Sequence, residues 1–326
     1  MASSSGNKGM KWGFTSRQHG RNDDPELKDR GSTGKNAAKF NTNRRRMIRE
    51  GWQEMTTLFV DPALCTRCGI CPIVCPMKII GPVDERTLPG VPEAKEMMCI
   101  RCGHCEVSCP SQAITLNFLP DEKVPLASAA GSLSPEDLGL YLRKRRSVRH
   151  FTPEPVDRET IKRILDVARY AASGGNGQPV QWLVVHDPAK VHALAGLTID
   201  WMKTLRDSNH PMSGMVPSII KAWEHGYDPV CRGAPHLVVA HIPEGNPVAP
   251  VDAIIALTHF DITAPAFGVG TCWAGFLSMA ATVYEPLQNA LALPAGQKYA
   301  YSLMFGHPRY KTYSIPRRNP AQITWQ

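Results

Sequence analysis

Two cysteine-rich segments constrain this chain more than any other feature. Residues 65–76, CTRCGICPIVCP, and residues 99–110, CIRCGHCEVSCP, share the pattern C-x-x-C-x-x-C-x-x-x-C-P at an offset of 34 residues. Eight of the ten cysteines in the 326 residues belong to these segments. The N-terminal residues contain no apolar signal segment, so this spacing indicates metal-binding thiolates in a reducing compartment and not a disulfide framework. The repeat also indicates a duplicated unit, because neither half could bury a core alone.

The repeated pattern favours two [4Fe-4S] clusters. Cysteines at three-residue intervals can hold one face of a cubane, and in the bacterial pattern with this spacing the fourth cysteine of each motif binds the other cluster. Structural zinc is the alternative, but zinc sites more often use paired C-x-x-C units. Residues 58–119 thus resemble a bacterial two-cluster ferredoxin domain. We assign one cluster to Cys65, Cys68, Cys71 and Cys109, and the other to Cys75, Cys99, Cys102 and Cys105.

Composition divides the chain into four sections. Residues 1–57 form a polar tail, and its first 50 residues hold twelve Lys or Arg against five Asp or Glu, which accounts for most of the net charge of +8. The cysteine-rich domain spans 58–119, a linker rich in Pro and Ser spans 120–133, and a larger domain spans 134–326. The tail could dock an acidic redox partner, a membrane surface or nucleic acid, or be a solvated extension. Its arginine run lacks interleaved aromatic residues, which argues against nucleic-acid binding.

The larger domain shows mixed helical and strand patterns. We expect helices starting after Ser134 and from Asp157 to about Ala172, because Ser and Asp are favoured N-cap residues. Strands are expected at 181–187, 236–242 and 299–305, which are short and rich in β-branched or aromatic residues. The stretch 251–267 is apolar on most sides, so it should be a helix buried in the core or at a subunit interface. The fold class predicted is α+β.

Four segments of this domain form a candidate cofactor site. RRSVRHF at 145–151 combines guanidinium groups with a hydroxyl, which suits a phosphate. AASGGNGQPVQW at 171–182, GVGTCWAGF at 268–276 and IPRRNP at 315–320 follow. In this order they resemble the FMN-dependent nitroreductase family across residues 134–326. The resemblance implies a nitroreductase-like, FMN-binding α+β sandwich, here preceded by the small ferredoxin-like domain, and a homodimer with FMN at the subunit interface.

The resemblance also implies roles for individual residues. Those expected at the phosphate and the pyrimidine edge of FMN are Arg145, Arg146, Ser147, Arg149, Arg317 and Arg318. Those expected at the ring or ribityl chain are Ser173, Asn176 and Gln178, and those at the other flavin edge are Trp273, Ala274 and Gly275. None of these motifs contains an evident proton donor. Cys231 and Cys272 stand alone in the sequence and are interpreted as small buried hydrophobes.

The expected function is that of an iron-sulfur flavoenzyme. Electrons would pass from a low-potential donor, such as reduced ferredoxin, through two [4Fe-4S] clusters to FMN, and then to a small acceptor such as a nitroaromatic, a quinone or an activated alkene. NAD(P)H is an alternative donor, although no G-x-G-x-x-G follows a predicted strand. The alternative function is an electron-transfer subunit that serves a protein partner. No apolar run is long enough to span a bilayer, and we expect a cytoplasmic protein.

One further stretch has two possible roles. Residues 196–230 include the large side chains Trp201, Met202, Met212, Met215 and Trp223. These could line a substrate lid, or they could belong to the ordinary packing of the core.

Overall fold

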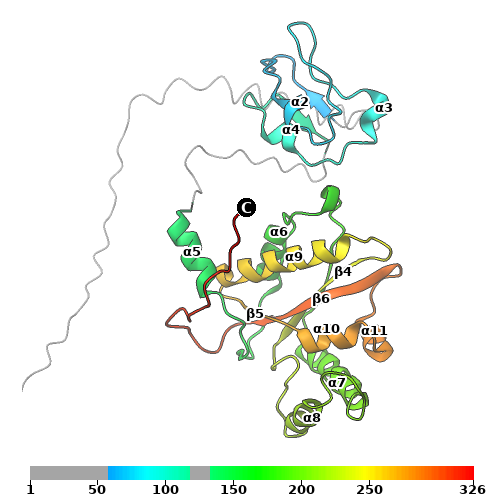
Figure 1. The fold of residues 1–326 in the computed structure, drawn as a ribbon, viewed down its shortest axis with the longest axis vertical. Helices are drawn as coiled ribbons and strands as arrows, with labels where there is room; N and C mark the ends of the chain where they lie inside the picture. Colours follow the sequence, from blue (N-terminus) through cyan, green and yellow to red (C-terminus); the bar gives the residue numbers. More distant parts are fainter. Residues whose placement is uncertain (1–57, 118–132) are drawn as a thin grey trace, which may run out of the picture.

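The computed structural model describes residues 58–117 and 133–326 (Figure 1). The predicted basic tail and nearly all of the predicted linker therefore lie outside the described residues. Within the described ranges, no helix combines the length and the apolar character that a membrane crossing requires.

The small domain is closed by two short strands at its ends. β1 (Leu58–Val60) pairs antiparallel with β2 (Ile114–Leu116), so the chain leaves the domain beside the point where it enters. Three short helices lie between these strands: α2 (Ile70–Val74), α3 (Glu93–Glu96) and α4 (His104–Val107). The buried core consists of a few aliphatic side chains together with Cys71 and Cys75. A core of this size gives little stability by itself, which is why domains of this kind usually depend on cross-links or metals.

The duplicated sequence adopts the same backbone conformation twice. Left-handed residues, with positive φ, recur at the 34-residue offset in both motifs. The corresponding pairs are Arg67 and Arg101 (φ 55° and 51°), Gly69 and Gly103 (φ 73° and 80°), and Lys78 and Gln112 (φ 52° and 53°). Because left-handed backbone is costly for most residues, its recurrence shows that both motifs wrap around their cysteines in the same way.

The larger domain is built on a four-stranded antiparallel sheet with the strand order β3-β4-β6-β5. The predicted strands are confirmed, but the short strand between 270 and 273 was not predicted. The strands are β3 (Gln181–Val185), β4 (His236–Pro243), β5 (Gly270–Trp273) and β6 (Gln297–Gly306).

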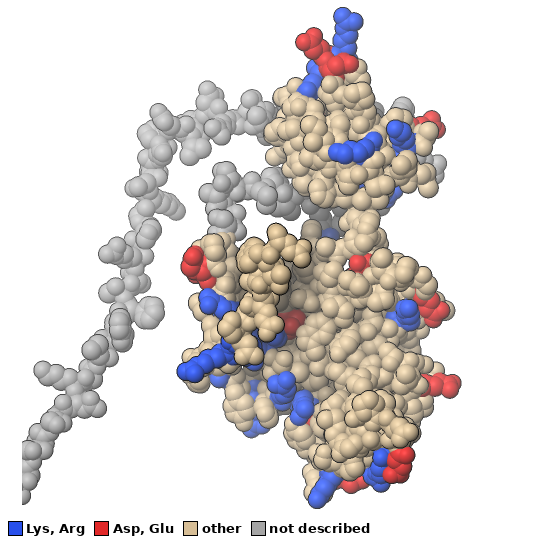
Figure 2. All heavy atoms as spheres, viewed as in Figure 1, with Lys and Arg blue, Asp and Glu red and all other residues tan. Residues whose placement is uncertain are grey.

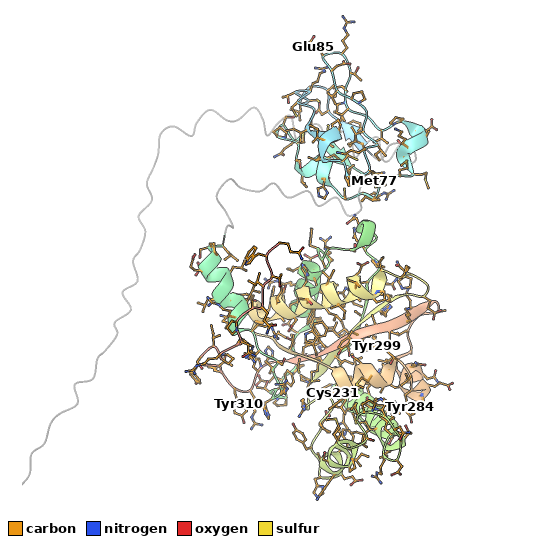
Figure 3. The ribbon with its side chains drawn as sticks, in the orientation of Figure 1. Met77, Glu85, Cys231, Tyr284, Tyr299 and Tyr310 are labelled. Carbon is orange, nitrogen blue, oxygen red and sulfur yellow. The ribbon has the colours of Figure 1, made fainter. Side chains whose placement is uncertain are left out.

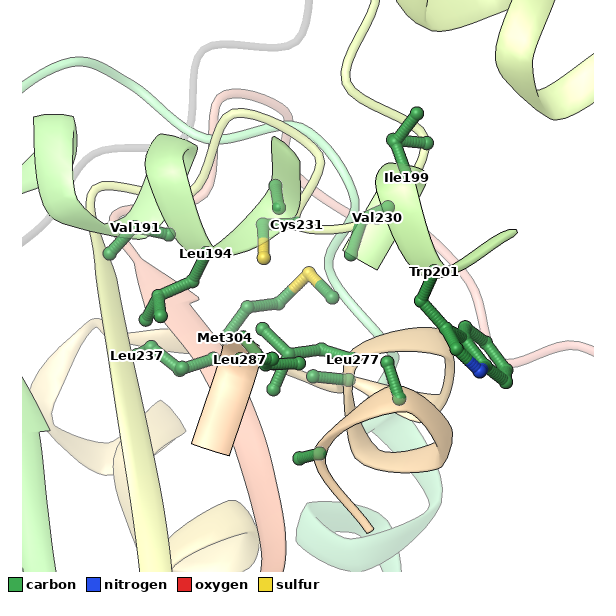
Figure 4. Packing of buried hydrophobic residues seen from close by; sticks show 14 of the residues in the cluster. Val191, Leu194, Ile199, Trp201, Val230, Cys231, Leu237, Leu277, Leu287 and Met304 are labelled. Atoms are coloured by element: carbon green, nitrogen blue, oxygen red, sulfur yellow. The ribbon is translucent and has the colours of Figure 1, made fainter. Parts of the chain in front are cut away.

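Strand β4 contributes to two cores because its side chains alternate between the two faces of the sheet. Leu237 and Val239 join one cluster, whereas Val238 and Ala240 join the other. The first face is covered by α7 (Pro188–Thr204), α8 (Val216–Glu224), α10 (Gly275–Ala281) and α11 (Glu285–Leu291). Figure 4 shows side chains of α7, α10 and α11 in this cluster. The second face is covered by α6 (Arg158–Ala168) and α9 (Ala249–Thr263). Helices on both faces of one sheet confirm the α+β sandwich.

Local capping sets where the first helices begin. α5 (Pro135–Lys144) starts at Ser134, whose hydroxyl accepts the N–H of Asp137 at 3.0 Å. α6 starts at Asp157, whose carboxylate accepts the N–H of Thr160 at 2.8 Å. Both caps were predicted from the sequence. The predicted end of α6 at Ala172 is wrong, since the helix stops at Ala168, four residues earlier and shortly before the glycine-rich segment.

The apolar stretch predicted as one helix over 251–267 has a different extent. α9 begins at Ala249 and ends at Thr263, and residues Ala264–Phe267 form the 3₁₀ turn η3. Pro265 accounts for this change, because proline supplies no N–H for the helical ladder. One side of α9 is buried as expected, but Val251 and Ile254 are 63% and 40% exposed.

Four of the five large side chains that suggested a substrate lid over 196–230 belong to the core of the larger domain. Trp201 and Met202 are buried in the core beneath the sheet, and Met212 and Trp223 pack against that core. The packing alternative therefore describes these four residues.

A buried histidine should make the stability of this domain depend on pH. His236 accepts the N–H of Val156 through Nε2 at 2.9 Å and stacks on His186, with ring centroids 4.3 Å apart. Burial, followed by the nearby imidazoles of His186 and His307, lowers the pKa of His236 from 6.5 to about 4. Because the unfolded chain then binds a proton that the folded chain does not, the stability from neutral His236 is complete above pH 6.5 and declines as the pH falls toward 4.

We expect the urea midpoint of the native chain to fall between pH 6.5 and 4 for this reason. His236→Phe keeps a flat ring but cannot titrate, and it leaves the Val156 N–H unpaired. The free energy of unfolding of this variant should be about 1–3 kcal/mol lower than that of the native chain at pH 7. The variant should then lose less additional stability than the native chain as the pH is lowered. Parallel pH profiles for the two chains would contradict this assignment.

Candidate functional site

The eight motif cysteines line two separate cavities in the small domain. One cavity, with an empty volume of about 300 Å³, is lined in part by Cys65, Cys68, Cys71 and Cys109. The other, of about 380 Å³, is lined in part by Cys75, Cys99, Cys102 and Cys105. Each cavity therefore combines three cysteines of one motif with the fourth cysteine of the other. These are the two groups that the sequence analysis assigned by crossed ligation.

The arrangement of donors suits a cluster better than a single ion. Among the described residues, no three His, Cys, Asp or Glu side chains converge closely enough to hold one metal ion. In a cubane each thiolate binds a different iron atom, so four cysteines around a wider cavity fit it, whereas tetrahedral zinc needs four donors around one point. Burial raises the pKa of Cys71 to about 11 and that of Cys105 to about 12. A metal that replaces these protons would release them at neutral pH.

In the larger domain, the arginine-rich segment lies beside β5. The N–H of Val148 donates to the carbonyl of Thr271 at 2.8 Å, and Ser147 forms a parallel bridge with Thr271. This approach needs a glycine, because a Cβ at Gly270 would lie 2.5 Å from Val148 Cγ2. The structure thus brings together the segments 145–151 and 268–276, which are far apart in the sequence.

Basic side chains surround this junction. Burial raises the pKa of the Cys272 thiol, and the positive charges of Arg149 and Arg232 oppose that shift. Figure 2 shows Lys and Arg side chains gathered on the side of the larger domain where α5 lies. The positive charge of this region suits an anionic group such as a phosphate.

A buried carboxylate joins three of these elements. Asp261, in the last turn of α9, accepts the hydroxyl of Thr271 and the indole N–H of Trp273, the latter at 3.2 Å. The Nη1 atom of Arg145 lies 3.3 Å from the Asp261 carboxylate. This nitrogen is buried and makes no hydrogen bond within the described residues. The ion pair with Asp261 can use at most one of the two N–H bonds of this nitrogen, so a donor remains for an acceptor that a cofactor supplies.

The glycine-rich loop is fixed by a second carboxylate of α9. Asp252 is buried in the first turn of the helix, and its Oδ1 accepts the N–H of Gly174 at 3.0 Å. Its Oδ2 has no hydrogen-bond partner among the described residues. Within the loop, the Ser173 hydroxyl accepts the N–H of Gln178 at 3.0 Å. The side chain of Gln178 is exposed.

The remaining predicted residues lie in three different settings. The amide of Asn176 donates to main-chain carbonyls of the small domain and not to any group of the larger domain that the structure describes. Ala274 is buried and donates to the Ser302 carbonyl, while Arg146 and Gly275 are partly buried. Arg317 and Arg318 are exposed, and the guanidinium of Arg318 bonds only to the neighbouring carbonyl of Arg317 among the described residues. Within the part of the chain that the structure describes, no hydrogen bond or ion pair joins these two arginines to the other three segments.

The two isolated cysteines are buried, as expected. Cys231 is fully buried and Cys272 is nearly so. Burial raises the pKa of both thiols. Inert, protonated thiols of this kind behave as small core side chains.

Sequence reasoning missed three residues of this region, namely Asp252, Asp261 and Arg232. A signal for the aspartates was present, because they are the two carboxylates of an otherwise apolar helix, and a buried carboxylate needs partners. Arg232 has no comparable signal, since the effect of its charge on Cys272 arises from the tertiary fold.

Comparisons with known proteins identify the family. Residues 142–307 match the family model "Nitroreductase family", and residues 64–114 match the "4Fe-4S dicluster domain". Because the first match covers half of the chain, this chain belongs to the nitroreductase family, and it carries a 4Fe-4S domain before the family domain. Members of this family are flavoprotein oxidoreductases, which makes electron transfer the general activity.

The individual proteins that resemble this chain either have low sequence identity to it or match it over a short stretch. A 5,6-dimethylbenzimidazole synthase from Rhodospirillum rubrum is 48% identical over 55 residues, which is 17% of this chain and 26% of that protein. The aligned part thus spans only about a quarter of this curated relative. A nitroreductase with bound FMN from Desulfitobacterium hafniense DCB-2 is 22% identical, with a TM-score of 0.48 over 59% of this chain and 99% of that one. A nitroreductase with bound FMN from Bacteroides fragilis is 18% identical, with a TM-score of 0.45 over 57% and 99%.

The Asp261 network should be important for the stability of the larger domain. Asp261→Ala would leave the partly buried Arg145 without its counter-charge, and should cost about 3 kcal/mol in urea unfolding. The matched control is Asp200→Ala, which breaks an exposed pair with Lys203 at 2.8 Å. The control should cost less than about 1 kcal/mol. Equal losses in the two variants would show that the network contributes no more than a surface ion pair.

Proposed function

We propose that this chain conducts electrons one at a time from a low-potential donor, such as reduced ferredoxin, through two [4Fe-4S] clusters to FMN. The reduced flavin then serves a small acceptor such as a nitroaromatic, a quinone or an activated alkene. The observation that carries the proposal is the presence, in one chain, of two cavities lined by four cysteines each and of a nitroreductase-family domain with a cationic junction. Reduced clusters of this kind favour a cytoplasmic setting.

In this proposal, the cysteines of each cavity hold one cluster. Cys65, Cys68 and Cys71 would bind the first cluster together with Cys109 from the second motif. Cys99, Cys102 and Cys105 would bind the second cluster together with Cys75. The left-handed turns at Gly69 and Gly103 direct the backbone around the cavities, which leaves room for the inorganic sulfides.

The flavin would lie where the arginine-rich segment, β5 and the glycine-rich loop approach one another. Bound FMN would accept single electrons and deliver two to the acceptor. Arg145, Arg146, Ser147 and Arg149 would bind its phosphate and pyrimidine edge, and Ser173 and Gln178 would face the ring or ribityl chain. Asp261 would keep the Arg145 guanidinium oriented, and Trp273 would be held by the same carboxylate.

A second copy of the chain would complete this site. The exposed surface of α9 includes Val251 and Ile254, and the C-terminal segment exposes Tyr313 and Trp325, which are 93% and 87% exposed. Apolar surface of this extent supports a homodimer in which the C-terminal segment packs on the neighbouring subunit. Arg317 and Arg318 would then reach the phosphate of the neighbour and not that of their own chain.

Cofactor analysis of the purified, anaerobically prepared chain tests the cluster assignment. We expect about eight iron atoms per chain, since each of the two clusters contains four. Cys75→Ser should disturb the cluster held by Cys99, Cys102 and Cys105, and Cys109→Ser should disturb the other. Electron paramagnetic resonance of the reduced variants distinguishes the two clusters. If each variant loses the cluster of its own motif instead, ligation is not crossed.

Steady-state turnover tests the enzymatic role. With reduced ferredoxin as donor and a panel of nitroaromatics, quinones and activated alkenes, the chain should reduce at least one class catalytically. Arg145→Ala should lower FMN retention while leaving iron content unchanged, because loss of a charged hydrogen bond costs about 1.5–3 kcal/mol. Tight binding of a protein acceptor, combined with no turnover on any member of the panel, would favour the alternative of an electron-relay subunit.

A further inference from the structure

The glycine-rich loop of the larger domain is hydrogen-bonded to the cysteine loop of the small domain. The side-chain Nδ2 of Asn176 donates to the carbonyl of Ile100 at 3.1 Å and to the carbonyl of Arg101 at 3.0 Å. Both acceptors lie between Cys99 and Cys102. In Figure 1 the small domain lies above the larger one, and the short 3₁₀ helix η2 (Gly174–Asn176) is the part of the larger domain that extends toward it.

The residue at position 176 meets two requirements at once. Its backbone is left-handed, with a φ of 55°, a conformation that Asn and Asp adopt more readily than most other residues. Its side-chain amide nitrogen donates hydrogen bonds to two consecutive backbone carbonyls, those of Ile100 and Arg101. Glycine would satisfy only the first requirement, and Asp would satisfy the backbone but supply no donor.

The loop is held on both sides of Asn176. The Gly174 N–H is bonded to the buried Asp252, and the Gln178 N–H is bonded to the Ser173 hydroxyl. The first bond attaches the loop to α9 and the second closes the loop on itself, so the Asn176 amide is presented from a fixed support. The contact therefore joins the small domain to the same helix that orients Arg145 through Asp261.

Ile100 and Arg101 also line one of the two cysteine cavities. They share that lining with Met77 and with Cys75, Cys99, Cys102 and Cys105. Figure 3 shows Met77 on the side of the small domain that faces the larger domain. The other cavity is lined by a different set of residues, which includes neither carbonyl bound by Asn176. Of the two cysteine cavities, the one lined by Cys75, Cys99, Cys102 and Cys105 is therefore the one next to the glycine-rich loop, which we call the flavin loop because the flavin is proposed to bind there.

We propose that the cluster held by Cys75, Cys99, Cys102 and Cys105 is the one that passes electrons to the flavin, and that Asn176 is the positioning residue that docks its loop on the flavin loop. This inference rests on the proposed function. The cluster held by Cys65, Cys68, Cys71 and Cys109 is then the one that receives electrons from outside. Two donor molecules of the reduced-ferredoxin class each lose one electron, and the flavin gains two electrons with protons from solvent.

The decisive variants alter the Asn176 side chain and preserve its backbone. Asn176→Asp keeps the shape but places a carboxylate against two carbonyls, and Asn176→Gly removes the side chain at a φ that glycine tolerates. The matched control is Asn289→Asp, at an exposed position of α11. All three variants should retain the iron and FMN content of the parent chain, since none removes a cysteine or an arginine.

Two measurements on the anaerobic holoprotein test the contact. In stopped-flow experiments with reduced ferredoxin, cluster bleaching should be unchanged, while flavin reduction should slow by about tenfold or more in both Asn176 variants, because a small displacement of the reacting partners strongly slows a positioned reaction. Hydrogen exchange of the amides at residues 98–103 should rise in the same variants. Asn289→Asp should change neither measurement.

The cluster assignment has its own test. Cys102→Ser and Cys68→Ser each remove one ligand from one cavity. When a small viologen radical supplies single electrons, flavin reduction should be slower by about tenfold or more in Cys102→Ser than in Cys68→Ser. The reverse order, or equal rates, would overturn the assignment.

Other outcomes separate the inference from the function on which it rests. Parental flavin-reduction rates and unchanged exchange in Asn176→Asp would overturn the docking role while leaving the proposed function intact. Loss of FMN from that variant with unchanged exchange at 98–103 would overturn it as well, because Asn176 would then serve the flavin. A parent chain without iron and flavin would refute the proposed function itself.

Discussion

The cofactor region of this molecule depends on two carboxylates buried in one helix. Asp252 lies in the first turn of α9 and holds the glycine-rich loop, while Asp261 lies in the last turn and holds Thr271, Trp273 and Arg145. The two positions are electrostatically different, since a carboxylate is favoured near a helix N-terminus and disfavoured near the C-terminus. Asp261 therefore needs the Arg145 guanidinium. A single helix, packed on the central sheet, thereby sets the relative positions of three segments that are remote in the sequence.

This arrangement also explains why the sheet is built around β4 and β6. β4 is buried on both faces, the second half of β6 from Ser302 to Gly306 is also buried, and β6 lies between β4 and β5. The close approach at Gly270 places the arginine-rich segment beside β5, so that its position is fixed by the sheet and not by the segment's own structure. The site is consequently an assembly of loops on a rigid support, the usual location of binding residues in α+β domains.

The sequence predicted those features that depend on local chemistry. Caps at Ser134 and Asp157, the three longer strands and the grouping of cysteines all follow from short-range patterns or fixed spacing. Strand β5 escaped prediction because four residues carry too little periodicity, and the end of α6 was placed too late. The partners of Asp252, Asp261 and Asn176 could not be predicted, since each bond joins segments brought together only by the tertiary fold. Asn176 was expected at the flavin, whereas its amide reaches carbonyls about 75 residues earlier in the chain.

The small domain makes electron transfer depend on its own folding. Its core is a handful of aliphatic side chains with Cys71 and Cys75 among them, so the groups that would bind iron are also part of the packing. Metal binding and folding are coupled in such domains, because the ligands converge only in the folded chain. The carbonyls of Ile100 and Arg101 belong to the turn that surrounds one cysteine cavity, and their direction depends on the left-handed backbone at Arg101. Assembly of that cluster would thus also shape the surface that Asn176 binds, so that only a domain with its cluster in place would dock against the flavin loop.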